Sequence, residues 1–192
     1  YPILKIMVDL FNYTRRASSV AHIGAIDLGG DNPIRIQSMT TTNTNDTEAC
    51  VRQAEEIIKA GGELVRFTTQ GSREAENMKN INAGIRADGY QTPLVADVHF
   101  NPNVADVAAL YCEKVRINPG NYVDPARKFI KQEYTDEEYA HELQKIEDRF
   151  VPFLNICKEH HTAIRIGVNH GSLSDRIRNR YGDTPEGIVE SC

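Results

Sequence analysis

The sequence predicts an α/β fold, because segments with apolar residues at alternate positions are each followed by a segment with helical periodicity. About five such strand and helix units follow one another along the chain. Neighbouring parallel strands need a crossover helix between them, so this strict alternation predicts a parallel sheet. The 192 residues, of which 40% are hydrophobic, are enough to build one sizeable core.

Charged residues in the middle of the strands predict a barrel rather than an open sheet. Residues two apart in a strand share a face, and helices would cover both faces of an open sheet, where arginines would be costly to bury. A barrel instead presents such residues at the mouth formed by the carboxyl ends of its strands. Five units do not close a barrel of eight, so we expect the N-terminal part of a TIM (β/α)8-type barrel, truncated in its fifth helix. The residues that we expect to face the mouth are Arg66, Asp97, His99, Arg116, Asn118, Arg165 and Asn169.

A small β-hairpin is expected to precede the barrel. Two short alternating runs flank residues 29–33, which carry the strong turn signal Gly-Gly-Asp-Asn-Pro. The second run, residues 34–39, is the expected first core strand. We therefore divide the chain into an N-terminal segment, residues 1–18, and the partial barrel, residues 19–192.

The later elements follow in order along the chain. Asn45 with Glu48 resembles a capping box, Asn101 with Pro102 supplies a cap and a proline at the first helical position, and Thr135 is expected to cap a long amphipathic helix. A further helix is expected at about residues 73–86. The remaining strands are expected at residues 64–69, 94–99 and 114–118, with a buried one within 163–172. The apolar stripe of the long helix is expected to be Tyr139, Leu143, Ile146, Phe150, Leu154 and Cys157.

The composition argues against several classes of protein. A formal net charge of −5 disfavours general binding to nucleic acid or to a membrane surface, so an anion site needs a few converging arginines. No apolar run is long enough to span a bilayer and no secretory signal is recognisable, so we expect a cytoplasmic protein. The cysteines have no metal-ligand spacing, which predicts no metal site here and reduced thiols packed on helices for the first three. They are Cys50, Cys112, Cys157 and Cys192.

Arg66, Arg116 and Arg165 are the main candidates for a functional site. Planar guanidinium groups suit phosphate oxygens, so three of them at one mouth predict a phosphate or diphosphate cradle. The alternative is that each arginine pairs with an interior carboxylate such as Asp97. Gly167, next to these residues in the last strand, is expected to leave room for a ligand or a neighbouring side chain.

Two further pairs of polar residues accompany the arginines. Asp97 and His99 share a face and could orient a hydroxyl or relay a proton, although a histidine hydrogen-bonded within the core is an equal alternative. Asn118 and Asn169 follow two of the arginines on the same faces and could donate to the same ligand. We assign no catalytic residue. The sequence contains no dinucleotide-binding turn, P-loop or nucleophile elbow.

Four ordered motifs carry a resemblance to a known family. They are residues 29–42 (GGDNPIRIQSMTTT), 95–100 (VADVHF), 114–121 (KVRINPGN) and 165–173 (RIGVNHGSL). Together they resemble the family of 4-hydroxy-3-methylbut-2-enyl diphosphate synthases, the iron-sulfur oxidoreductases of the methylerythritol phosphate route to isoprenoids. The resemblance covers nearly the whole chain from about Arg15 onward.

The resemblance implies a TIM-type barrel that binds 2-C-methyl-D-erythritol 2,4-cyclodiphosphate, joined to a C-terminal domain with a [4Fe-4S] cluster. The reaction it implies is reductive ring opening and dehydration, with electrons from ferredoxin or flavodoxin, in a homodimer that joins one subunit's barrel to the other's cluster. Carried over by position, Arg66, Arg116 and Arg165 would hold the diphosphate. The residues that would line the substrate are Asp97, His99, Asn118 and Asn169.

Two departures from the family pattern affect what this chain could do alone. None of its cysteines matches the cluster ligands of the family, and the later barrel strands are missing. We therefore expect an inactive fragment that carries only the substrate-binding part of the barrel. The long segment 122–162 resembles the larger form of the family, which has an extra domain inserted after the barrel.

Two alternatives from other functional classes remain open. A barrel like that of dihydropteroate synthase would also bind a diphosphate, but without metal or redox chemistry. A non-catalytic half-barrel would instead associate with itself through its exposed strand edges.

Overall fold

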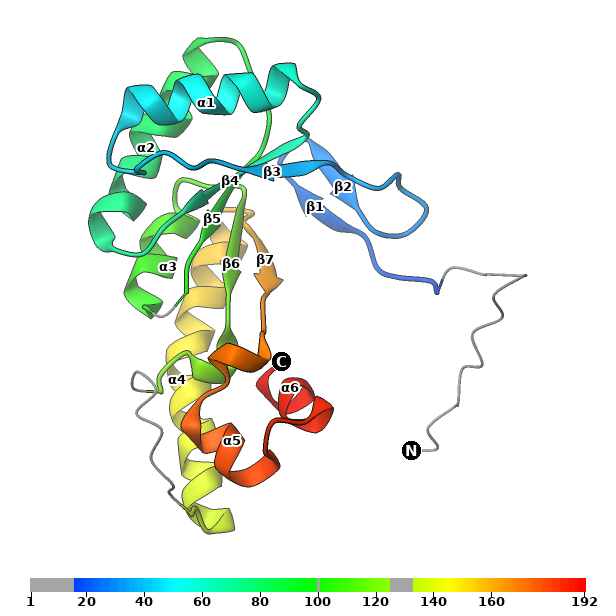
Figure 1. Ribbon diagram of the computed structural model, residues 1–192, viewed down its shortest axis with the longest axis vertical. Helices are drawn as coiled ribbons and strands as arrows, with labels where there is room; N and C mark the ends of the chain where they lie inside the picture. The colour runs from blue at the N-terminus through cyan, green and yellow to red at the C-terminus, as the bar shows by residue number, and fades with distance from the viewer. Residues whose placement is uncertain (1–15, 100, 125–132) are drawn as a thin grey trace.

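The computed structural model describes residues 16–99, 101–124 and 133–192. Its main sheet has five parallel strands in the order β3-β4-β5-β6-β7, so each strand pairs with its neighbour in sequence (Figure 1). This unreversed order is that of a barrel wall, whereas a doubly wound sheet reverses its strand order near the middle. The predicted α/β fold with part of a TIM barrel is confirmed. The strands are β3 (Gln37–Met39), β4 (Leu64–Thr68), β5 (Leu94–Asp97), β6 (Lys114–Ile117) and β7 (Ala163–Ile166).

Helices connect the strands and cover the outer face of the sheet (Figure 1). Between them and the sheet lies the larger hydrophobic core, in which Val65, Phe67, Val115 and Ile117 of the strands are fully buried. This is the face that the alternation predicts to be apolar. The α-helices are α1 (Thr47–Lys59), α2 (Ser72–Ala87), α3 (Pro102–Ala109), α4 (Asp136–Glu159), α5 (Asp175–Tyr181) and α6 (Pro185–Ser191), and two short 3-10 helices are η1 (Pro119–Asn121) and η2 (His170–Ser172). None of the described helices is both long and apolar enough to cross a membrane.

The predicted hairpin is present, with strands β1 (Ala21–Ile23) and β2 (Ile26–Leu28). Its turn, however, lies between these strands and not at residues 29–33. Gly24 in this turn has φ +55°, a conformation that glycine adopts without strain. Residues 29–33 lead from the hairpin to β3 instead.

The hairpin forms the floor of the inner side of the sheet. Ile23 is buried in a small cluster with Leu64 and Val95, on the sheet face opposite the helices. The first core strand is shorter than the predicted 34–39, since β3 begins three residues later and Ile34 is 85% exposed.

Local capping signals set most helix starts. Asn101 and Thr135 act as N-caps as predicted, and Thr135 forms a complete capping box with Glu138. The predicted cap of α1 is wrong by one residue: the side chain of Asp46, not that of Asn45, accepts a hydrogen bond from the backbone N–H of Ala49, the third helical residue. An aspartate and an asparagine cap helices almost equally well, so composition alone does not separate them.

The apolar stripe predicted for α4 is partly wrong. Cys157 of the predicted stripe is buried in the main core, as is Phe153 outside it, whereas Leu143 and Leu154 of the stripe are exposed. Near its other end the helix packs Tyr139 edge-on against Tyr181 of α5. The buried side of α4 shifts because its two halves pack against different neighbours. In the described part of the long segment 122–162, namely residues 122–124 and 133–162, α4 is the one regular element.

The last strand also differs from prediction. β7 is confined to four residues and lies at one edge of the sheet in the described structure, so Ile166 is 43% exposed and not buried. The chain beyond it remains paired for one more residue, where the backbone N–H of Gly167 donates to the Ile117 carbonyl at 2.7 Å.

Candidate anion-binding site

Strand register brings the predicted polar residues onto one face. Asp97 is the register partner of Thr68 on one side and of Arg116 on the other, and Arg116 is in turn the partner of Arg165. Partners in a parallel ladder point their side chains to the same face, so these residues form a row across the four strands β4 to β7. The row lies at the carboxyl halves of the strands, where TIM barrels place their active sites.

Asp97 is the centre of this row. Its side chain is 1% exposed and forms ion pairs with two arginines. Nη2 of Arg66 pairs with Oδ2, and Nη1 of Arg116 lies 3.3 Å from Oδ1. Both arginines therefore pair with an interior carboxylate, which is the alternative that the sequence left open beside a diphosphate cradle. A single carboxylate thus orients two guanidinium groups.

Gly167 makes room for one of these guanidinium groups. Arg116 Nη2 donates to the Gly167 carbonyl at 3.0 Å, and a Cβ atom added at position 167 would overlap Nε of Arg116. Of the two reasons predicted for this glycine, the structure shows a neighbouring side chain. The local geometry fixes Arg116 from two directions.

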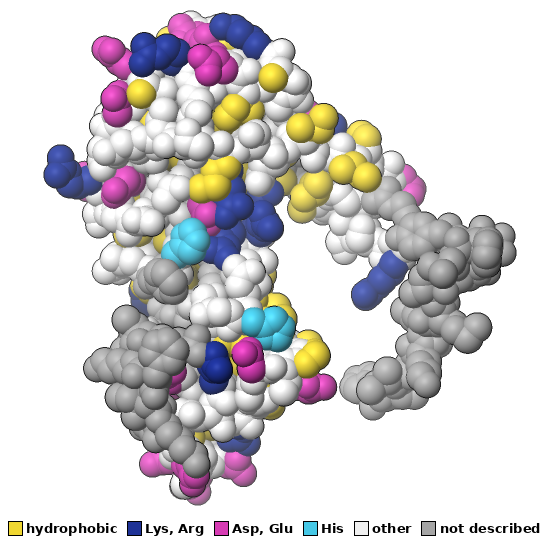
Figure 2. Space-filling view, in the orientation of Figure 1, with side chains coloured by type: hydrophobic (Ala, Val, Ile, Leu, Met, Phe, Trp, Pro, Cys, Tyr) yellow, Lys and Arg dark blue, Asp and Glu magenta, His cyan; other side chains and the backbone are white. Residues whose placement is uncertain are grey.

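The inner face carries more positive than negative charge. Lys114 precedes Arg116 by two residues on the same face and is 7% exposed. Burial lowers the pKa of both groups from their ordinary values, and the positive charges of Arg66 and Arg165 lower both further, whereas Asp97 opposes the shift for Arg116. Among the described residues the cluster has four cations, completed by Arg165, and Asp97 as its carboxylate. Side chains of Lys and Arg gather at the middle of the face shown in Figure 2. A bound anion would relieve this imbalance.

His99 and Asn118 each follow a residue of the row by two positions in the chain, His99 after Asp97 and Asn118 after Arg116. Nδ1 of His99 lies 3.8 Å from Oδ1 of Asp97. Asn118 is buried, and its Oδ1 accepts a hydrogen bond from the Ser191 hydroxyl at 3.3 Å. In the described part of the chain its Nδ2 has no hydrogen-bond partner. A buried amide donor without a partner is costly, so this group is available to a ligand.

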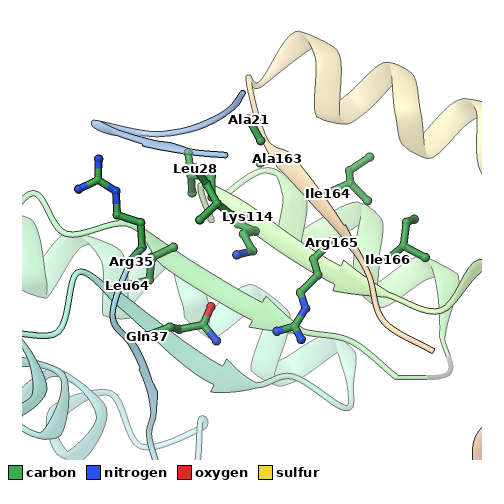
Figure 3. Close-up of a pocket in the computed structure, with 11 residues that line it drawn as sticks. Ala21, Leu28, Arg35, Gln37, Leu64, Lys114, Ala163, Ile164, Arg165 and Ile166 are labelled. Atoms are coloured by element: carbon green, nitrogen blue, oxygen red, sulfur yellow. The ribbon is translucent and has the colours of Figure 1, made fainter. Parts of the chain in front are cut away.

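Arg165 and Asn169 are less tightly held. Arg165 is exposed and lines a pocket of about 480 Å³ that opens at β7, into which its guanidinium group points (Figure 3). Asn169 is exposed too, and its carbonyl accepts hydrogen bonds from Ser172 of its own loop. The structure therefore joins Arg66, Asp97 and Arg116 directly and leaves Asn169 outside that contact network.

Two residues of the site were not singled out in the sequence. Strand alternation could have identified Lys114, because it lies on the same strand face as Arg116 and Asn118. Ser191 carries no such signal, since it is 73 residues from Asn118 and reaches it only through the packing of α6 against η1.

The three buried cysteines do not suit an iron-sulfur cluster. Cys50, Cys112 and Cys157 are buried, and burial raises the pKa of each thiol, that of Cys157 to about 12. Cluster ligation needs thiolates, which these surroundings disfavour. Cys112 lies in the loop before β6 and not on a helix as predicted. No group of three or more potential metal ligands occurs in the portions of the chain that the structure describes.

Comparison with known proteins gives consistent matches. The family described as "GcpE TIM-barrel domain" matches residues 18–192. A protein of Phocaeicola vulgatus named "4-hydroxy-3-methylbut-2-en-1-yl diphosphate synthase (flavodoxin)" is 77% identical over 185 residues, which are 96% of this chain and 30% of that protein. Proteins of the same name from Parabacteroides distasonis and Porphyromonas gingivalis are 67% identical over 182 residues and 53% over 186. These matches cover 95% and 97% of this chain, and 30% and 32% of the two relatives. The chain spans about a third or less of the length of these relatives.

Proposed function

The chain belongs to the GcpE TIM-barrel domain family, and from this premise we propose that it binds the substrate of a 4-hydroxy-3-methylbut-2-en-1-yl diphosphate synthase. The substrate is 2-C-methyl-D-erythritol 2,4-cyclodiphosphate, a compact dianion that lacks any aromatic group. A shallow row of fixed cations suits such a ligand better than an apolar cleft does. The enzyme as a whole is an oxidoreductase of isoprenoid biosynthesis.

The observation that carries this proposal is the buried carboxylate between two arginines. Asp97 holds Arg66 and Arg116 in place without cancelling the charge of the cluster. Guanidinium groups fixed in advance lose little conformational freedom when a diphosphate binds, which favours affinity. Arg165, exposed at the edge of the pocket, would complete the contact with the diphosphate.

The amides and His99 would contact the rest of the ligand. The unpartnered Nδ2 of Asn118 can donate to a ligand oxygen. Asn169 would reach the ligand from the loop that follows β7, and His99, next to Asp97, would contact or protonate a ligand hydroxyl. With these roles, Asp97 is a positioning residue and the others bind substrate.

The reductive part of the reaction lies outside the residues described here. A [4Fe-4S] cluster would supply electrons to the bound substrate, but the three buried cysteines do not fit it, so no step of this proposal passes through them. We also propose flavodoxin as the electron donor, in keeping with the names of the relatives, and a cytoplasmic homodimer as the working enzyme.

A chimera tests this function at the full length of the relatives. This chain replaces the matching 185 residues of the Phocaeicola vulgatus protein, and anaerobic conversion of the cyclodiphosphate is measured with reduced flavodoxin. We expect activity, and we expect Arg165→Ala to weaken substrate affinity about 10- to 150-fold, the range for one charged hydrogen bond. Arg165 is the preferred position because it supports no buried ion pair in the described structure.

Arg52→Ala is the matched control, because Arg52 is an exposed arginine on the outer helix α1. It should leave affinity and turnover unchanged. Equal affinities for the chimera and its Arg165→Ala variant would refute the assignment of Arg165. A folded chimera with reconstituted iron and no turnover of the cyclodiphosphate would refute the proposed function.

A further inference from the structure

We propose that Lys114 is a further anion-binding residue of this site, and that its ammonium group contacts a phosphoryl oxygen of the bound ligand from the hairpin side. It would extend the cradle from the arginine row toward the floor formed by β1 and β2. The identity of the ligand as a diphosphate rests on the proposed function. The presence of an anion at Lys114 rests on the surroundings of this one side chain.

Lys114 is buried without a partner of opposite charge. Lys114 is the first residue of β6 and is 7% exposed. Among the described residues, its ammonium group forms no ion pair or hydrogen bond. Its register partners are Val95 and Ala163, which offer no charge. Buried lysines are rare unless paired, so an unpaired one calls for a ligand or a functional reason.

The ammonium group faces an open space and not the packed core. Lys114 lines the pocket of about 480 Å³ that also includes Arg165, Gln37 and the hairpin residue Ile23. Lys114, Gln37 and Arg165 come from β6, β3 and β7 and point toward the same space in Figure 3. The pocket is thus reached by two cations and an amide, which together can donate to one anion.

The charges around this pocket exclude a cationic ligand. Of the residues that line it, Arg35, Lys114 and Arg165 are cations and none is a carboxylate. Arg35 is already neutralised by Glu63, whose Oε1 lies 2.8 Å from its Nη1. Lys114 and Arg165 remain uncompensated, and their mutual repulsion is part of what lowers the pKa of Lys114. A phosphoryl group between them would replace this repulsion by two attractions.

Lys114 also differs from the arginines in what its loss would do to the fold. Arg66 and Arg116 share the buried carboxylate of Asp97, so removing either takes one of the two ion pairs from a carboxylate that is 1% exposed. Removing the charge of Lys114 leaves nothing unpaired and ends a burial penalty. Lys114→Met, which keeps the length and apolar stem, should therefore bind anions more weakly and yet melt no lower than the wild-type chain.

The first measurement is calorimetric titration of this chain with inorganic pyrophosphate. We expect Lys114→Met to weaken binding about 10- to 150-fold, the range for one charged hydrogen bond. Lys79→Met is the matched control, because Lys79 is exposed on the outer helix α2, and it should bind as the wild type does. Equal affinities for wild type and Lys114→Met, or no binding by the wild type, would overturn the inference. So would a lowered melting temperature of Lys114→Met, which would indicate a structural role.

The second measurement labels the amine itself. Pyridoxal 5′-phosphate carries both an anion and an aldehyde; the Lys114 amine would add to the aldehyde and lose water to form an imine, which borohydride then reduces to a stable secondary amine. Peptide mass spectrometry should find this adduct at Lys114, and pyrophosphate should prevent it there while leaving the label on Lys79 unchanged. An adduct at Lys114 that pyrophosphate does not reduce would contradict an anion-binding role.

These results separate the inference from the proposed function. Lost pyrophosphate binding in Lys114→Met together with a chimera that does not convert the cyclodiphosphate would support the anion site and reject the named substrate. An active chimera whose affinity for the cyclodiphosphate is unchanged by Lys114→Met would support the named substrate and reject the anion-binding role of Lys114.

Discussion

At the scale of single residues, the site is defined by how few negative charges it contains. Asp97 is in contact with two guanidinium groups while Lys114 and Arg165 add charge that it does not balance. A carboxylate that is 1% exposed is stable only because its two partners compensate for its lost hydration. The carboxylate therefore belongs to the structure as much as to the function.

Replacing Asp97 tests this dependence. Asp97→Asn keeps the shape of the side chain but leaves Arg66 and Arg116 without a counter-charge, so we expect the free energy of unfolding to fall by about 3–5 kcal/mol. Urea denaturation monitored by circular dichroism measures it. Asp106→Asn is the control, since its ion pair with Arg149 at 2.5 Å is about a quarter exposed and should be worth about 1 kcal/mol or less. Equal losses in the two variants would mean that the arginines do not depend on Asp97.

At the scale of elements, local sequence signals place the helices and the strand faces. The parity that separates Phe67 from Arg66, and Ile117 from Arg116, is visible in the sequence because a strand repeats every two residues. The errors lie where two local signals compete or where an element has two environments. Asn45 and Asp46 compete for one cap, and α4 meets different neighbours along its length.

The cap of α1 gives a test at this scale. Asp46→Ala removes the side-chain acceptor for the Ala49 N–H and should lower the free energy of unfolding by about 1 kcal/mol. Asn45→Ala, at the neighbouring exposed position, should lower it by less than about 0.5 kcal/mol. Urea denaturation of both variants measures the two values. If Asn45→Ala lowered the free energy of unfolding more than Asp46→Ala does, Asn45 and not Asp46 would be the cap of α1.

At the scale of the whole molecule, the β-hairpin matters because it closes the inner side of the sheet. Ile23 packs against Leu64 and Val95 on the face that carries the cations further along the strands. The inner side therefore has an apolar floor below a charged mouth. This division keeps the uncompensated charges away from the core between sheet and helices and leaves them facing the pocket.

Truncating the floor should destabilise the chain. Ile23→Ala removes buried methyl groups from the cluster with Leu64 and Val95, so we expect a loss of about 2–5 kcal/mol in the free energy of unfolding. Ile34→Ala, a matched change at a side chain that is 85% exposed, should change it by no more than about 0.5 kcal/mol. Thermal and urea unfolding give the comparison. If Ile23→Ala behaved like the control, the hairpin would not be part of the folded core.

The sequence by itself determined the parallel α/β architecture and the face on which Arg66, Asp97, Arg116 and Arg165 lie. These follow from alternation and from local capping signals, which depend on residues a few positions apart. Only the tertiary structure decided which of these charges are paired. Register between strands sets whether Asp97 meets two arginines, whether Gly167 accommodates Arg116, and whether Lys114 finds a partner. Charge pairing depends on distances between residues far apart in the chain, and those distances exist only once the strands have assembled.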